Sequence, residues 1–184
     1  AYEVIKNFSV SATFKYLFSD MGRIGNSRGA SSVAFDLGGL YKCEINDWEG
    51  AGWSVGLHVS NLGPKINYLT SKDALPATVK VGGAADLPFL QMHKLTLTAD
   101  LGYRLSPADV QALSVSAGAE YAWRELVMLR GGYHCGDKKK GDASYATAGA
   151  GVEYAGVRLD FAWLFAGHEY LARNTFWVSL GYSF

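Results

Sequence analysis

The sequence is poor in the residues that crosslink small secreted domains or interrupt regular structure. Its 184 residues include only 2 Cys and 4 Pro, too few cysteines for a disulfide framework. No C-x-x-C pair or Cys/His cluster with metal-ligand spacing occurs, so we expect no metal site and no cofactor. Lys+Arg and Asp+Glu both number 17. This balance argues against a nucleic-acid partner, because phosphate backbones attract an excess of basic residues.

Long apolar runs are also missing. None reaches the length of about 18 residues that a transmembrane helix needs. The first residues, Ala1-Tyr2-Glu3, do not form the charged and then apolar leader of a signal peptide, so we expect that a leader is absent or already removed. The sequence therefore predicts neither a helical membrane anchor nor a visible targeting segment.

What the sequence does contain is a strict alternation of apolar and polar residues. Near the C-terminus, for example, Phe176, Val178, Leu180 and Tyr182 are separated by Trp177, Ser179 and Gly181. This period of two residues is typical of a β-strand with one apolar face. We find it in ten segments: 8–16, 33–41, 53–59, 77–85, 95–103, 115–123, 127–133, 146–154, 157–165 and 176–184. No helical segment is predicted.

An alternating sheet is compatible with a soluble barrel or sandwich, or with a membrane barrel whose apolar face points outward. Most of these segments can reach the roughly 9 to 11 residues that a tilted strand needs to cross a bilayer. Aromatic residues also gather at the strand ends, as in the girdles of membrane barrels: Tyr41, Trp53, Trp123, Tyr154 and Phe184 at one end, and Tyr16, Tyr103, Tyr133 and Phe165 at the other. We therefore predict one all-β domain over residues 1–184, an antiparallel transmembrane β-barrel.

The connections between the predicted strands alternate in length. The long ones are 19–31, 61–76, 105–113, 135–144 and 166–174, and the shorter ones are 45–52, 86–93, 124–126 and 155–156. Bacterial outer-membrane barrels have short periplasmic turns and longer extracellular loops. We therefore predict an outer-membrane protein with extracellular long loops and both termini in the periplasm.

The two tightest turns predict the strand register. Pairing across 155–156 places Glu153 opposite Arg158, and pairing across 124–126 places Glu120 opposite Arg130. Opposite charges that face each other across a ladder support that register. We interpret both pairs as structural pairs in the barrel lumen, with a role in pore selectivity as the alternative.

Several segments resemble the PorV/PorQ family, outer-membrane proteins of Bacteroidota related to the FadL transporters. The matching segments are 34–39 (AFDLGG), 60–68 (SNLGPKINY), 75–83 (LPATVKVGG), 129–133 (LRGGY) and 136–141 (GDKKKG). The chain looks closer to PorV, mainly through Leu75-Pro76-Ala77 and the basic loop at 137–140. The family resembles 14-stranded barrels, which leaves two alternatives: the ten predicted strands close on themselves, or they are the C-terminal part of a longer barrel.

The resemblance implies a part in type IX protein secretion. PorV-like proteins receive secreted cargo, by its C-terminal signal domain, from a translocon barrel and pass it to a cell-surface attachment complex. No catalytic residue or cofactor is implied. Our candidates for partner contact are in the long loop 61–76: Pro64, Lys65, Tyr68, Leu75 and Pro76. The alternative is that this loop only folds over the barrel mouth.

Three further interpretations stay open. Lys138, Lys139 and Lys140 form a basic run that is either solvated or in contact with an acidic partner or anionic lipopolysaccharide. A FadL-like transporter of hydrophobic small molecules would need an apolar pocket in the lumen. A lipid hydrolase could use His58 and Ser60, an H-x-S spacing that resembles lipid A deacylases, because an imidazole beside a hydroxyl activates it as a nucleophile.

The two cysteines test the predicted topology. Cys43 and Cys135 fall at opposite ends of their strands, about 30 Å apart across the bilayer. A disulfide requires Cα atoms within about 7 Å, so both should be free thiols.

Overall fold

The computed structural model describes residues 2–19, 30–67, 72–167 and 174–183. This part of the chain forms one antiparallel sheet of 11 strands, in the order β1-β2-β3-β4-β7-β8-β9-β10-β11-β12-β13, and a separate two-stranded ladder, β5-β6. The strands are β1 (Tyr2–Ile5), β2 (Phe8–Ser19), β3 (Ala30–Glu44), β4 (Gly52–Leu62), β5 (Ile66–Asn67), β6 (Lys72–Asp73), β7 (Thr78–Phe89), β8 (His93–Arg104), β9 (Leu113–Trp123), β10 (Val127–Cys135), β11 (Tyr145–Tyr154), β12 (Val157–Ala166) and β13 (Thr175–Tyr182). Two short 3₁₀ turns, η1 (Ala108–Val110) and η2 (Lys138–Lys140), lie in loops.

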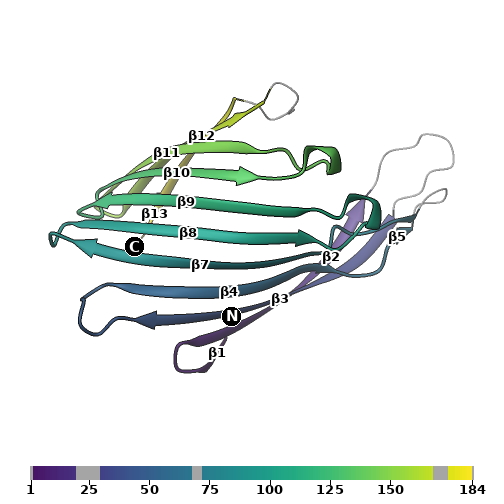
Figure 1. The fold of residues 1–184 in the computed structure, drawn as a ribbon, viewed down its shortest axis with the longest axis horizontal. Coiled ribbons are helices and arrows are strands. Elements are labelled where there is room, and N and C mark those ends of the chain that lie inside the picture. The colour runs from purple at the N-terminus through teal and green to yellow at the C-terminus, as the bar shows by residue number, and fades with distance from the viewer. Residues whose placement is uncertain (1, 20–29, 68–71, 168–173, 184) are drawn as a thin grey trace.

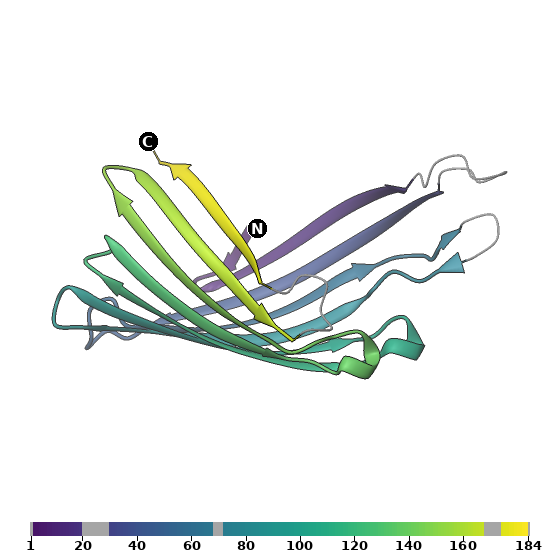
Figure 2. The same cartoon turned by 90° about the horizontal axis from the view of Figure 1, so that it is seen from above.

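The main strands lie side by side in chain order (Figure 1) and the sheet curves into an open trough with β1 and β13 at its two edges (Figure 2). The predicted all-β antiparallel class is confirmed, and each of the ten predicted strands is present. Strand β1 was not predicted from the sequence, because it has only four residues and a register shift between Glu3 and Ile5 that interrupts the alternation. The short β5-β6 ladder inside the long loop 61–76 was not predicted either.

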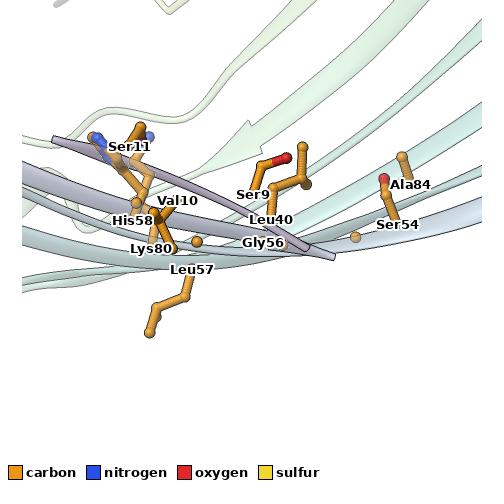
Figure 3. Close-up of a pocket in the computed structure, with 14 residues that line it drawn as sticks. Ser9, Val10, Ser11, Leu40, Ser54, Gly56, Leu57, His58, Lys80 and Ala84 are labelled. Atoms are coloured by element: carbon orange, nitrogen blue, oxygen red, sulfur yellow. The ribbon is translucent and has the colours of Figure 1, made fainter. Parts of the chain in front are cut away.

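The two faces of the sheet differ in polarity. On one face, Phe35, Leu57, Leu97 and Leu129 are 43% to 54% exposed, and on the other lie residues such as Ser54 and His58. Figure 3 shows Leu57 on the opposite side of the sheet from Ser9, Leu40, Ser54 and His58. Exposed apolar side chains over a whole sheet face indicate an apolar surrounding medium.

The small core argues against a soluble sandwich. The buried apolar residues of the described part are mostly alanines, such as Ala30, Ala34 and Ala51, and no large side chain there is fully buried. A sandwich would instead interdigitate large side chains between two sheets. No helix of the described residues is long and apolar enough to cross a membrane.

The connections alternate between a short-turn end and a long-loop end of the sheet, as predicted. Three of the short turns contain two consecutive residues at positive φ, as is common in tight hairpin turns: Leu90-Gln91, Arg124-Glu125 and Ala155-Gly156. The predicted connection 86–93 is shorter than expected, because β7 continues to Phe89 and leaves only residues 90–92 in the turn.

The predicted register is confirmed on both hairpins. Glu120 is opposite Arg130 and Trp123 opposite Val127 in the β9-β10 ladder, and Glu153 is opposite Arg158 in the β11-β12 ladder. Cys43 and Cys135 are both free. Cys43 lies near the short-turn end of β3 and Cys135 at the long-loop end of β10, so the two thiols lie at opposite ends of the sheet, as expected.

Candidate functional site

The long loop 61–76 begins at a β-bulge. In the β3-β4 ladder, Leu37 pairs with Val59 but Phe35 pairs with Leu62, so β4 contains one extra residue opposite Asp36. Asn61, within this bulge, has φ of 58°, a left-handed conformation that asparagine tolerates better than most residues. The bulge bends β4 where the loop begins.

The carboxylate of Asp36 holds the start of the loop. Asp36 is only 7% exposed. Its Oδ1 accepts a hydrogen bond from the backbone N–H of Asn61 at 2.8 Å, and its Oδ2 lies 2.5 Å from the Lys15 ammonium. Lys15 Nζ also donates to Asn61 Oδ1 at 3.2 Å. A buried carboxylate thereby has both a counter-ion and a backbone donor, as burial requires.

Two further hydrogen bonds and one close backbone contact hold the loop 61–76. Asn61 Nδ2 donates to the carbonyl oxygen of Pro76 at 3.2 Å, which joins the two ends of the loop. Ser32 Oγ donates to the carbonyl oxygen of Pro64 at 3.0 Å. Gly63 lies so close to β3 that a Cβ there would be 2.1 Å from the carbonyl oxygen of Val33. The first residues of the loop are therefore packed against β3 and not suspended in solvent.

The structure places four of the five predicted contact residues. Pro64, Lys65 and Pro76 are exposed. Leu75 is 7% exposed and packs beneath the loop, where its Cδ1 would be 2.9 Å from a Cβ on Gly63. Tyr68 lies outside the described residues. The residues that hold this loop were not predicted from the sequence, namely Lys15, Ser32, Asp36 and Asn61.

The predicted luminal pairs belong to a larger ionic network near the short-turn end. Arg130 contacts the carboxylates of both Glu120 and Asp160, the latter at 2.6 Å. Arg158 lies 2.7 Å from Asp160 and 3.7 Å from Glu153. Asp160 was missed, although it lies two residues after Arg158 and therefore on the same face of β12. It joins the two predicted pairs into one network.

A second long loop, residues 136–144, is held by an imidazole. Ser116 Oγ lies 3.0 Å from His134 Nδ1, and His134 Nε2 lies 3.0 Å from Asp142 Oδ1. The His134 ring also stacks on Tyr145 with centroids 4.8 Å apart. This chain of hydroxyl, imidazole and carboxylate links β9, β10 and the loop.

The basic run of this loop is only partly solvated. Lys140 Nζ donates to the carbonyl oxygen of Gln111 and its own carbonyl accepts a hydrogen bond from Arg104 Nη1 at 3.2 Å. Lys140 thus connects the loops 105–112 and 136–144. Lys138 and Lys139 are exposed.

The proposed hydrolase pair does not form in the described residues. Ser60 Oγ donates to the carbonyl oxygen of Thr78 at 3.5 Å, and His58 has Lys80 as its cross-strand neighbour. The backbone N–H groups around Ser116 belong to the ladders on both sides of β9, so they are not free to hold an oxyanion beside the Ser116–His134–Asp142 chain. Among the described residues, no group of three or more His, Cys, Asp or Glu is placed to hold a metal ion.

A shallow hollow of about 440 Å³ lies in the sheet where glycines replace larger side chains. Its polar lining residues are Ser9, Ser11, Ser54, His58 and Lys80, with Leu40 as the largest apolar side chain on that face (Figure 3). A site for a hydrophobic ligand would be mostly apolar with a few polar groups. The surface that lines this hollow is mostly apolar with a few polar groups, but the hollow is wide open and does not enclose a ligand.

Comparison with known families identifies one similarity. Residues 1–111 match the model of the family described as "Type IX secretion system protein PorV". The match covers more than half of the chain and includes β1 to β8, the Asp36 anchor and the whole loop 61–76. No curated protein matches the chain.

Proposed function

Since the chain belongs to the PorV family and is an outer-membrane component of type IX secretion, we propose that it binds secreted cargo proteins by their C-terminal signal domain and passes them from the translocon barrel to the cell-surface attachment complex. The observation that carries this proposal is the anchored loop 61–76 within the matched region. A loop with fixed backbone loses less conformational entropy on binding than a free one.

The proposal includes an orientation. We place the long-loop end outside the cell and both termini in the periplasm, because the alternation of short turns and long loops follows the pattern of outer-membrane barrels. On this orientation the exposed residues Pro64, Lys65 and Pro76 face cargo, and Leu75 supports them from beneath. Tyr68 stays a candidate contact from the sequence alone.

The exposed Lys138 and Lys139 form a second proposed contact site at the long-loop end of the sheet, with different chemistry. Their ammonium groups suit an acidic partner or the phosphates of lipopolysaccharide. We expect this contact to be salt-sensitive, since exposed charges are screened within about 10 Å at 0.1 M ionic strength.

A pull-down from outer membranes tests the proposal. The tagged protein is compared with a variant whose residues 61–76 are replaced by a Gly/Ser segment of equal length, and with a control whose short-turn residues 45–51 are replaced in the same way. We expect cargo and a large barrel to co-purify with the parent and the control, and cargo to be lost from the loop variant.

Two outcomes would contradict this function. Retention of cargo by the loop variant would show that the loop is not the contact site. Recovery of a bound hydrophobic small molecule, with no protein partner, would favour the transporter that the FadL resemblance suggests. The PorV family is not a known enzyme family, and we expect no hydrolysis product in any arm.

A further inference from the structure

The anchor of the loop 61–76 is a single buried carboxylate that joins three separate segments. Asp36 lies on β3, its counter-ion Lys15 on β2, and its backbone donor Asn61 at the end of β4. Through Asn61 Nδ2 the same cluster reaches Pro76, at the far end of the loop. The cluster around Asp36 therefore contacts the loop both where it leaves the sheet and where it returns.

The charges of this cluster balance within it. Lys15 and Asp36 neutralise each other at 2.5 Å, so no ion from a partner is needed to compensate them. Hydrogen bonds between ionised groups and neutral donors are stronger than neutral ones. The cluster is therefore suited to hold a backbone position and not to bind a charged ligand.

Close packing against β3 depends on this position. A Cβ on Gly63 would lie 2.1 Å from the Val33 carbonyl oxygen. Only a glycine therefore fits between the loop and the strand. Ser32 Oγ, on a residue that is 7% exposed, reaches the Pro64 carbonyl at 3.0 Å. If Asn61 moved, neither contact could keep its geometry, and the exposed side chains of Pro64 and Lys65 would change direction.

We propose that Asp36 is a positioning residue for partner binding: by holding the backbone N–H of Asn61 it keeps Pro64 and Lys65 in the orientation that cargo recognises. This inference rests on the proposed function and adds a requirement, namely that the loop must be held and not merely present. Asp36 itself, being buried, does not touch the partner.

The test compares two ways of releasing the loop with two matched controls. Asp36→Ala removes the acceptor, and Gly63→Ala forces the loop away from β3 without changing any charge. The first control is Asp100→Ala, since Asp100 is a carboxylate on β8 with no hydrogen bond or ion pair to a described residue. The second is Gly181→Ala, because a Cβ there meets no atom within 4 Å.

Three measurements are made on each full-length variant in outer membranes: heat-modifiable migration as a sign of barrel assembly, hydrogen exchange of the backbone amides of residues 61–67, and the amount of cargo that co-purifies. We expect Asp36→Ala and Gly63→Ala to assemble, to exchange about tenfold faster or more in this segment, and to lose most of the bound cargo. Both control variants should match the parent protein in all three measurements.

The outcomes separate this inference from the proposed function. Faster exchange with unchanged cargo binding would overturn the positioning role of Asp36 while leaving cargo binding itself in place. Unchanged exchange in both variants would overturn the anchor. If Asp36→Ala does not assemble, Gly63→Ala carries the test alone. Failure of the proposed function would appear elsewhere, as cargo binding that survives complete replacement of residues 61–76.

Discussion

At the short-turn end of the sheet most charged side chains bind one another, whereas at the long-loop end several polar side chains also bind the backbone of the loops. Arg130 with Glu120, Arg158 with Glu153 and Lys94 with Asp86 are pairs of side chains from neighbouring strands. At the other end, beside the side-chain contacts of Lys15 with Asp36 and of His134 with Asp142, side chains bind loop backbone. The backbone groups are the Asn61 N–H and the carbonyl oxygens of Pro64, Pro76, Gln111 and Lys140.

This difference separates stability from function within one sheet. Side-chain pairs across a ladder reinforce a register that the strands already fix by their backbone bonds. Side chains that hold loop backbone instead determine a shape that nothing else fixes. We therefore expect substitutions at the short-turn end to lower the free energy of unfolding, and substitutions at the long-loop end to change partner binding with little effect on the sheet.

The largest expected effect tests a premise of this comparison, that both sets of polar contacts lie on the face away from lipid. Leu97 and Thr98 are neighbours on β8 and point to opposite faces. We expect Leu97→Arg to cost roughly 2 to 4 kcal/mol near mid-membrane, and Thr98→Arg to cost much less because its charge stays in the lumen. Urea titration of the protein refolded in lipid vesicles measures both. Equal losses would mean that the lipid-facing and luminal faces are wrongly assigned.

The next largest effect sharpens the contrast between the two ends. We expect Arg130→Met to lower the free energy of unfolding by about 1 kcal/mol, the upper range for a pair that solvent partly screens. A double-mutant cycle with Glu120→Gln should show a coupling that weakens at high salt. Cargo co-purification should stay at the level of the parent protein. A loss of cargo with this variant would contradict the division between the two ends.

The sheet could be predicted well from the sequence because the two features that determine it, the strand pattern and the tight turns, are local. A period of two residues marks each long strand, and a tight turn fixes the register of the hairpin on both sides of it. The Glu120–Arg130 and Glu153–Arg158 pairs followed directly from that register. Extending the same register from Trp123 and Val127 also places Ser116 opposite His134. This pair could therefore have been predicted from the sequence.

The contacts that hold the loops could not be predicted from the sequence, for a physical reason. The bulge opposite Asp36 inserts one residue into β4, and alternation alone does not reveal where a strand gains a residue. The contacts of Asn61 and Asp142 depend on loop backbone conformation, which no periodic pattern encodes. A polar residue within an apolar-rich segment, as in Ala34-Phe35-Asp36-Leu37, together with the left-handed tendency of Asn61, was the available signal.

The smallest expected effect tests whether the two anchored loops are independent. Replacing His134 by Ala removes the contacts to Ser116 and Asp142, each at 3.0 Å. Because one such hydrogen bond contributes about 1 kcal/mol net, we expect hydrogen exchange in residues 136–144 to rise by up to roughly tenfold, with the free energy of unfolding of the whole sheet nearly unchanged. His58→Ala serves as the control for the exchange of residues 136–144, because the His58 imidazole makes no hydrogen bond to a described residue and lies on β4. Exchange in residues 61–67 should stay at the parent rate, since that loop is held by Asp36 on a different part of the sheet. If both loops loosen together, the long-loop end is one cooperative unit, and the anchor of each loop cannot be assigned to single side chains.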